Sequence, residues 1–171
     1  PPPITIETVM ATFQRLAGDA QTIFRRGLVE AFRNLSRQHA SNDGFSVGPR
    51  MVVKRIVRVV RMSGGGEWVS TDEWGTQHLR DVDRVLHVLS GRKPPEHMQG
   101  IVQQVWEAIG RKEWEASTDL VRVKWHKNGN GHLWILDEKL RQDVNREIAA
   151  FFGSALGAAP ARPRSAQHAN H

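Results

Sequence analysis

The apolar positions in the first part of the chain recur at spacings of three and four residues. They are Val9, Phe13, Leu16, Ala20, Ile23, Phe24, Leu28, Ala31, Phe32 and Leu35. This spacing predicts a long amphipathic helix from Thr5 to about Gln38 with one buried face. Gly18-Asp19 could divide it into two helices, because Gly costs roughly 1 kcal/mol relative to Ala inside a helix.

The segment from Met51 to Met62 is rich in Val and Ile and has no helical stripe, which predicts a strand. Gly64-Gly65-Gly66 then forms a flexible link to a short partner strand at Glu67 to Val69. A β-ribbon is the simplest outcome.

Three further helices are expected, and Trp106 in the second of them is expected to lie in the core. Their boundaries follow from capping and breaking residues. They run from the capping-box sequence Ser70 to Glu73 as far as Gly91, from Pro94-Pro95 to Gly110, and from Asp137 to about Phe152.

A hairpin is predicted between residues 119 and 136, because apolar and polar residues alternate before Asn128-Gly129. That dipeptide favours a two-residue type I′ turn. In this register His132 and Trp134 share a face with Val123 and Trp125. A slip of one residue would move them to the face of the cations, and the sequence leaves both registers open.

These elements predict a single α+β domain over residues 1–152. A small antiparallel sheet, made of the hairpin at 119–136 and strands within 51–69, packs against four or five helices. Residues 153–171 are mostly Ala, Pro, Gly and Arg, and we expect a disordered tail there.

Composition narrows the class of protein. The chain has 171 residues and no Cys, which excludes disulfides, thiolate metal sites and a Cys nucleophile. No apolar run approaches the roughly 18 to 20 residues that span a bilayer. We therefore expect a soluble, cytoplasmic protein without a membrane partner.

Charge placement says more than the net charge of +6. No acidic residue lies between Asp43 and Glu67, and a second basic stretch enters the predicted hairpin. Such stretches attract phosphates, although a solvated or salt-bridged strand is an equally plain interpretation. The predicted phosphate-binding residues are Arg50, Lys54, Arg55, Arg58, Arg122, Lys124 and Lys127.

His126 and His132 flank the predicted turn and are the candidate residues for catalysis. A metal-dependent nuclease would need an acid such as Asp81, Asp83 or Asp137 beside them. The chain lacks a recognised metal-ligand spacing, and a type I′ turn would point the two imidazoles to opposite faces. We therefore predict no metal site, no cofactor and no phosphate loop.

Trp125 and Trp134 are expected to pack together in the core, because large aromatic side chains dominate small cores. The alternative is a base-stacking platform flanked by Lys and Arg, as in proteins that bind single strands.

Several segments resemble an uncharacterised family of bacterial, phage and genomic-island proteins of unknown function. They are residues 8–13 (TVMATF), 23–36 (IFRRGLVEAFRNLS), 41–50 (SNDGFSVGPR), 79–91 (LRDVDRVLHVLSG) and 124–134 (KWHKNGNGHLW). Some members of that family are joined to a DNA-adenine methyltransferase domain. The resemblance implies mobile-element biology near DNA, but this chain lacks the methyltransferase's Asp/Asn-Pro-Pro-Tyr/Phe motif.

The leading hypothesis is a DNA-associated, non-catalytic module that contacts phosphates through its basic strands. The alternative is an inhibitor or adaptor that binds a host or phage protein. A metal-dependent nuclease is the third hypothesis.

Overall fold

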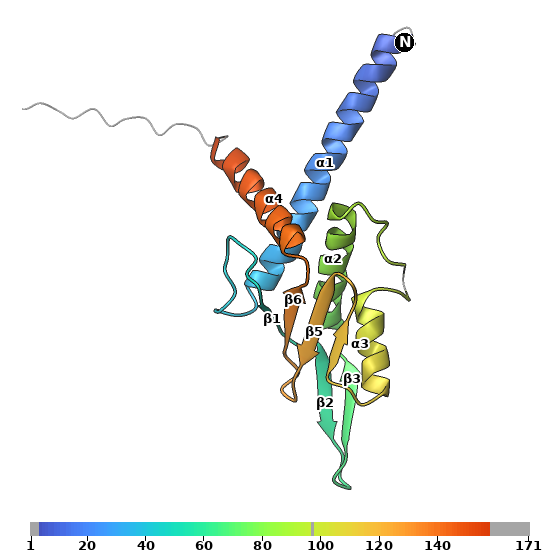
Figure 1. Cartoon of the computed structure of the whole chain (residues 1–171), viewed down its shortest axis with the longest axis vertical. Coiled ribbons are helices and arrows are strands. Elements are labelled where there is room, and N and C mark those ends of the chain that lie inside the picture. Colours follow the sequence, from blue (N-terminus) through green and yellow to red (C-terminus); the bar gives the residue numbers. More distant parts are fainter. Residues whose placement is uncertain (1–3, 97, 158–171) are drawn as a thin grey trace, which may run out of the picture.

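The computed structural model describes residues 4–96 and 98–157 and has the predicted α+β fold (Figure 1). Its helices in this part of the chain are α1 (Ile6–Ser36), α2 (Glu73–Leu89), α3 (Ile101–Gly110) and α4 (Glu138–Gly157). Its strands are β1 (Met51–Val53), β2 (Val57–Arg61), β3 (Glu67–Thr71), β4 (Glu115–Ser117), β5 (Val121–Trp125) and β6 (Gly131–Ile135).

The strands form two antiparallel sheets. One has the strand order β1-β6-β5-β4, and β2 and β3 form a separate hairpin that projects from the body (Figure 1). The larger sheet buries one face, where Val121, Val123 and Trp125 of β5 lie beside Leu133 and Ile135 of β6. The helices cover this face, and within the described residues none of them lies over the other face (Figure 1).

The strand predicted over residues 51–62 is interrupted. Arg55 has a φ of 56°, a left-handed conformation that is uncommon for a residue with a side chain. The bend at this residue separates β1 in the large sheet from β2 in the projecting hairpin. The bend fits tightly against the start of α2, because a Cβ on Gly75 would lie 2.0 Å from the main-chain oxygen of Arg55.

The β5–β6 turn differs from the predicted type I′ turn. The N–H of Gly129 donates to the carbonyl of His126 at 2.9 Å, and that of His126 donates to the carbonyl of Asn130 at 2.9 Å. Gly129 has a φ of 87°, whereas Asn128 has no positive φ. This is a three-residue loop with Gly in the left-handed position, a common hairpin turn.

The longer loop shifts the register by one residue. Lys124 now pairs with His132 and Arg122 pairs with Trp134. The prediction that Trp134 packs with Trp125 is therefore wrong: Trp125 is 1% exposed in the core, and Trp134 lies on the opposite face.

Helix α1 is continuous through Gly18-Asp19, but its buried residues begin only at Leu28. The expectation that one face is buried along its whole length is thus wrong. Trp106 is also misplaced in the prediction, since its side chain is 60% exposed.

Three predicted boundaries move. Helix α3 begins at Ile101 rather than at Pro94-Pro95, because Gly100 has a positive φ and Asp83 accepts the N–H of Ile101. Helix α2 is capped by Asp72 rather than Ser70, because Ser70 pairs with Arg58 in the hairpin. Helix α4 continues to Gly157, so the first residues of the predicted tail are helical. The rest of that tail, residues 158–171, lies outside the described residues.

Candidate nucleic-acid interface

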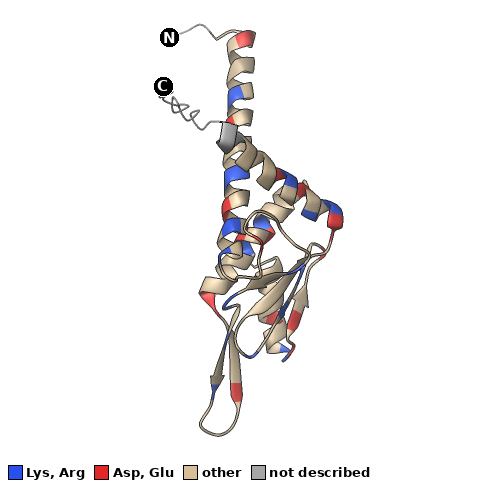
Figure 2. Cartoon of the chain, turned by 90° about the vertical axis from the view of Figure 1, so that its left-hand side faces the viewer, with Lys and Arg blue, Asp and Glu red and all other residues tan. Residues whose placement is uncertain are grey.

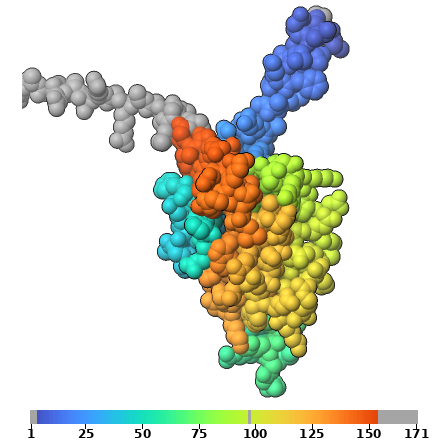
Figure 3. All heavy atoms as spheres, in the orientation of Figure 1, coloured from blue at the N-terminus to red at the C-terminus, as the bar shows by residue number. Residues whose placement is uncertain are grey.

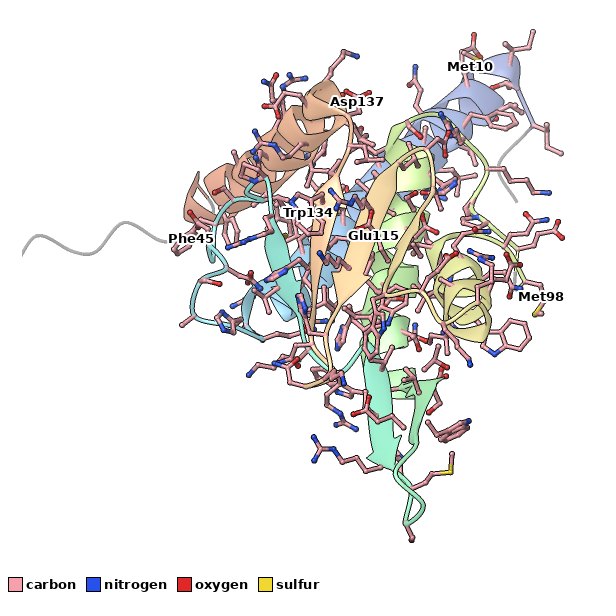
Figure 4. All side chains as sticks on the ribbon, turned by 60° about the horizontal axis from the view of Figure 1, so that its bottom comes forward. Met10, Phe45, Met98, Glu115, Trp134 and Asp137 are labelled. Atoms are coloured by element: carbon pink, nitrogen blue, oxygen red, sulfur yellow. The ribbon has the colours of Figure 1, made fainter. Side chains whose placement is uncertain are left out.

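The open face of the large sheet gathers planar and cationic side chains from neighbouring strands. Alternation along β5 places Arg122 and Lys124 on it, and the register places Trp134 and His132 directly opposite them. Figure 4 shows Trp134 on this face together with Glu115 of β4. We call the set of Arg122, Lys124, His132 and Trp134, with His126 at the turn, the open-face cluster.

The two histidines contact each other, contrary to the prediction that they point to opposite faces. Nε2 of His126 lies 3.4 Å from Nδ1 of His132, and the ring centroids are 5.3 Å apart. The His132 ring also meets the Trp134 ring edge to face at 5.7 Å. His132 and Trp134 share a face of β6 in either register, so the one-residue change brings His126 to them and the three rings form a row.

Arg122 completes this row. Its guanidinium carbon lies 4.8 Å from the centroid of the Trp134 ring, within cation–π range. Its Nε and Nη2 donate to the carboxylate of Glu115 at 2.7 and 2.9 Å. The hydrogen bond from Arg122, which outweighs burial, and the charges of Arg122 and Lys124 hold the pKa of Glu115 below its usual value.

Some of the predicted phosphate-binding cations are already paired with acids. Arg55 and Arg58 lie 3.2 and 3.6 Å from the same carboxylate oxygen of Asp72. Lys127 lies 3.0 Å from Glu67 in the projecting hairpin. Together with Arg122, these residues match the alternative interpretation of salt-bridged strands.

Arg50, Lys54 and Lys124 differ from the paired cations. All three are exposed. Within residues 4–96 and 98–157 none of them forms an ion pair. Arg50 directly precedes β1, and Lys124 lies on β5 opposite His132.

The electrostatic surroundings of His132 show that positive charge gathers on the open face. Burial lowers the pKa of His132, and repulsion from Arg50, His126, His39 and Lys124 lowers it further. At pH 7 the imidazole is therefore neutral and lies in a positive field. A phosphate placed here would be attracted by that field.

The acids suggested for a nuclease lie away from the open-face cluster and form hydrogen bonds within and between the helices. Asp83 on α2 accepts a hydrogen bond from the N–H of Ile101 at 2.8 Å and caps α3. Asp137 caps α4 through the N–H groups of Lys139 and Leu140. Asp81 is hydrogen-bonded to Gln77. Among the described residues, no group of three or more His, Asp or Glu side chains could hold a metal ion.

Cationic residues on α1 and α4 lie among acidic ones. Figure 2 shows Lys and Arg interspersed with Asp and Glu along α1 and α4. On α4, for example, Arg141 pairs with Glu138 and Arg146 with Asp143.

A second exposed feature lies between the projecting hairpin and α3. A groove of about 530 Å³ is lined there by Trp68 and Trp106, whose side chains are 56% and 60% exposed. Glu107 and Arg111 also line the groove. The sequence offered no signal for this groove, because its two tryptophans come from distant segments.

None of the helices described in the structure has both the length and the apolar character to cross a membrane.

A family model for the domain of unknown function DUF4942 matches residues 1–154. The chain belongs to the DUF4942 family. The expectation of an uncharacterised family is thereby confirmed. No curated protein and no solved structure matches this DUF4942 chain.

Proposed function

We propose that this DUF4942 domain is a non-catalytic nucleic-acid-binding module whose open-face cluster binds single-stranded DNA. The observation that carries the proposal is the row of planar groups formed by His126, His132, Trp134 and Arg122. Nucleobases stack on aromatic rings and on guanidinium planes. Because Arg122 lies over the Trp134 ring, a base would stack on the guanidinium or on the exposed His126 ring.

The unpaired cations supply the second part of the proposal. Arg50 and Lys124 lie on either side of His132 and are close enough to lower its pKa. They would contact phosphates while bases stack along the row. Lys54 is exposed after β1 and would extend the contact. The paired residues Arg55, Arg58 and Lys127 would contribute less, because an acid already neutralises each of them.

This proposal fits the wider expectation for the chain. A module that binds exposed single strands would suit a cytoplasmic phage or mobile-element protein that acts near DNA. An attached DNA-adenine methyltransferase in some family members would place the module beside its DNA substrate.

The test is fluorescence anisotropy with a labelled oligothymidine strand and the matching duplex. We expect the single strand to bind more tightly, with a log–log salt slope of about −2 for three phosphate contacts at roughly −0.7 each. Because the Trp134 ring holds the Arg122 guanidinium in place, Trp134→Leu should weaken binding about tenfold, roughly 1.4 kcal/mol, which is within the range of one stacking contact. Lys124→Glu should weaken it further and flatten the salt slope.

A matched control is Arg84→Glu on α2, which lies behind the sheet. It makes the same change in charge at an exposed residue, so binding should change little. No detectable binding at low salt, or equal losses in Arg84→Glu and Lys124→Glu, would refute the proposal.

The Trp68–Trp106 groove favours a second candidate function, an adaptor or inhibitor that binds a protein. Large exposed apolar side chains around a groove are typical of protein-binding surfaces. In this case one stoichiometric protein partner would remain bound after nuclease treatment. That partner should be lost in Trp106→Ser and retained in Trp134→Leu.

A further inference from the structure

The first part of α1 extends away from the rest of the molecule. Figure 3 shows it as a projecting rod, and every residue from 6 to 23 is exposed. Closer to the body, Arg25 pairs with Glu147 of α4 at 2.7 Å. Within residues 4–96 and 98–157, no other helix or strand therefore buries the side chains of this projecting part.

This projecting helix carries an uncovered apolar stripe. The exposed fractions of its large side chains are 82% for Ile6, 39% for Val9, 53% for Met10, 65% for Phe13, 54% for Leu16 and 70% for Ile23. All of these except Met10, together with Ala20, occupy first and fourth positions of successive heptads: Ile6, Phe13 and Ala20 in one row, and Val9, Leu16 and Ile23 in the other. This is the spacing of a coiled-coil seam.

Burial of this stripe would stabilise the helix. In proteins, most helical stability comes from the packing of an amphipathic face rather than from the intrinsic propensity of the residues. The exposed side chains offer on the order of 700 Å² of apolar surface, close to the roughly 800 Å² per partner in a standard interface. The stripe alone thus approaches the area that a stable dimer needs.

We infer that the projecting part of α1 pairs with the same segment of a second copy of this chain in an antiparallel helix dimer. The stripe is complementary to itself when reversed. Ile6 then lies opposite Ile23, and Phe13 lies opposite Leu16. Val9 lies opposite Ala20, so each layer of the seam has an apolar residue from both copies.

The flanking positions favour the antiparallel direction over the parallel one. Met10 and Ala17 form an apolar row beside the seam, and in an antiparallel pair this row meets its own copy. A parallel pair would set it against the polar row of Thr12 and Asp19. The antiparallel direction also places the two bodies at opposite ends of the helix pair.

The test begins with sedimentation equilibrium of the whole chain at micromolar concentrations. We expect twice the mass of one chain, and a monomer for Phe13→Asp. Gln14→Asp makes a similar change on the polar face and should remain dimeric. Because Phe13 is 65% exposed and lies outside the core, the monomeric variant should still fold, with a cooperative urea transition followed by the fluorescence of the buried Trp125, although its projecting helix should lose part of its circular dichroism signal without a partner. A monomeric wild-type chain, or loss of the dimer in Gln14→Asp, would overturn the inference.

The direction of pairing can be read by cross-linking, since the chain contains no Cys. Thr12→Cys mixed with Asp19→Cys should be joined by a short bis-maleimide more efficiently than either variant alone. In a parallel pair these two positions would lie about 10 Å apart along the axis. Efficient cross-linking of Thr12→Cys with itself, and none in the mixture, would overturn the antiparallel pairing.

Discussion

The three-residue turn at Gly129 and a type I′ turn should respond differently to alanine substitution. Replacing Gly129 by Ala forces a side chain into a φ of +87°, at a cost of about 1–2 kcal/mol. The new Cβ would lie 2.6 Å from the main-chain oxygen of Val57. That carbonyl belongs to backbone, so relieving the contact should add about 1–3 kcal/mol.

Asn128 should tolerate the same replacement, since its φ is not positive. Asn128→Ala removes one exposed hydrogen bond, between its Oδ1 and the N–H of Asn130 at 3.0 Å. A loss of about 0.5 kcal/mol is expected. In a type I′ turn both central residues need a positive φ, so Asn128→Ala would then also cost about 1–2 kcal/mol.

Urea unfolding followed by tryptophan fluorescence measures the difference. With an m-value of about 2 kcal/mol/M, Gly129→Ala should lower the midpoint by about 1.5 M and Asn128→Ala by about 0.3 M. Gly64→Ala is the control, because a Cβ there meets nothing within 4 Å. Equal midpoint losses for Asn128→Ala and Gly129→Ala would refute the three-residue turn.

Three other predictions use the same unfolding assay. Trp125→Ala should cost about 3–5 kcal/mol and Trp134→Ala about 1 kcal/mol or less, because only the first fills the core; equal costs would contradict the register. Burial alone would raise the pKa of Asp72. The cap hydrogen bond and the two nearby guanidiniums outweigh burial, so the pKa lies below its usual value. Stability from Asp72 should thus be complete above pH of about 3.9, fall as pH drops through the lowered pKa, and lose this dependence in Asp72→Asn. Burial raises the pKa of Asp83, so stability should be lost as pH rises from about 3.9 through the raised pKa, where the buried carboxyl ionises. At pH 7 Asp83→Asn should match or exceed wild type in stability, whereas Asp83→Ala should lose about 1–2 kcal/mol with the cap of α3; a large loss in both variants would argue against this account.

The pH dependence of DNA binding follows from the lowered pKa of His132. A bound phosphate would favour the protonated imidazole, so affinity should rise as pH falls from 7 toward 5.5. In the absence of DNA, protonation is disfavoured in the folded protein, and stability should fall as pH drops through about 6.5. His132→Gln should remove both effects, as measured by anisotropy and by urea unfolding; a pH response that persists in His132→Gln would assign it to another group.

Sequence periodicity could predict the fold class and most elements, because helices and strands bury faces with different periods. It could not predict where a buried face ends. The apolar stripe of α1 continues unchanged from Phe13 to Phe32, yet only its last part meets the body. An apolar stripe indicates that one face of a helix is buried, but it does not distinguish burial against the same chain from burial against another chain.

The sequence also could not predict which acids pair with the basic residues. The stretch around Arg55 and Arg58 contains no acid, but Asp72 approaches both through the cap of α2. Glu67 reaches Lys127 from a separate hairpin. Counting charges along the chain therefore overestimated the basic surface, and only tertiary contacts distinguish Lys124 from its paired neighbours.

The register of β5 and β6 depends on contacts beyond the hairpin itself. The carbonyl of Gly129 accepts hydrogen bonds from the N–H groups of Ile56 and Val57, at 2.8 and 3.3 Å. A two-residue turn would carry this carbonyl elsewhere and leave the bend at Arg55 without these partners. Buried backbone groups rarely remain unpaired, so the bend selects the longer loop. The same bend that separates the two sheets thereby sets His132 and Trp134 beside the cations of the open face.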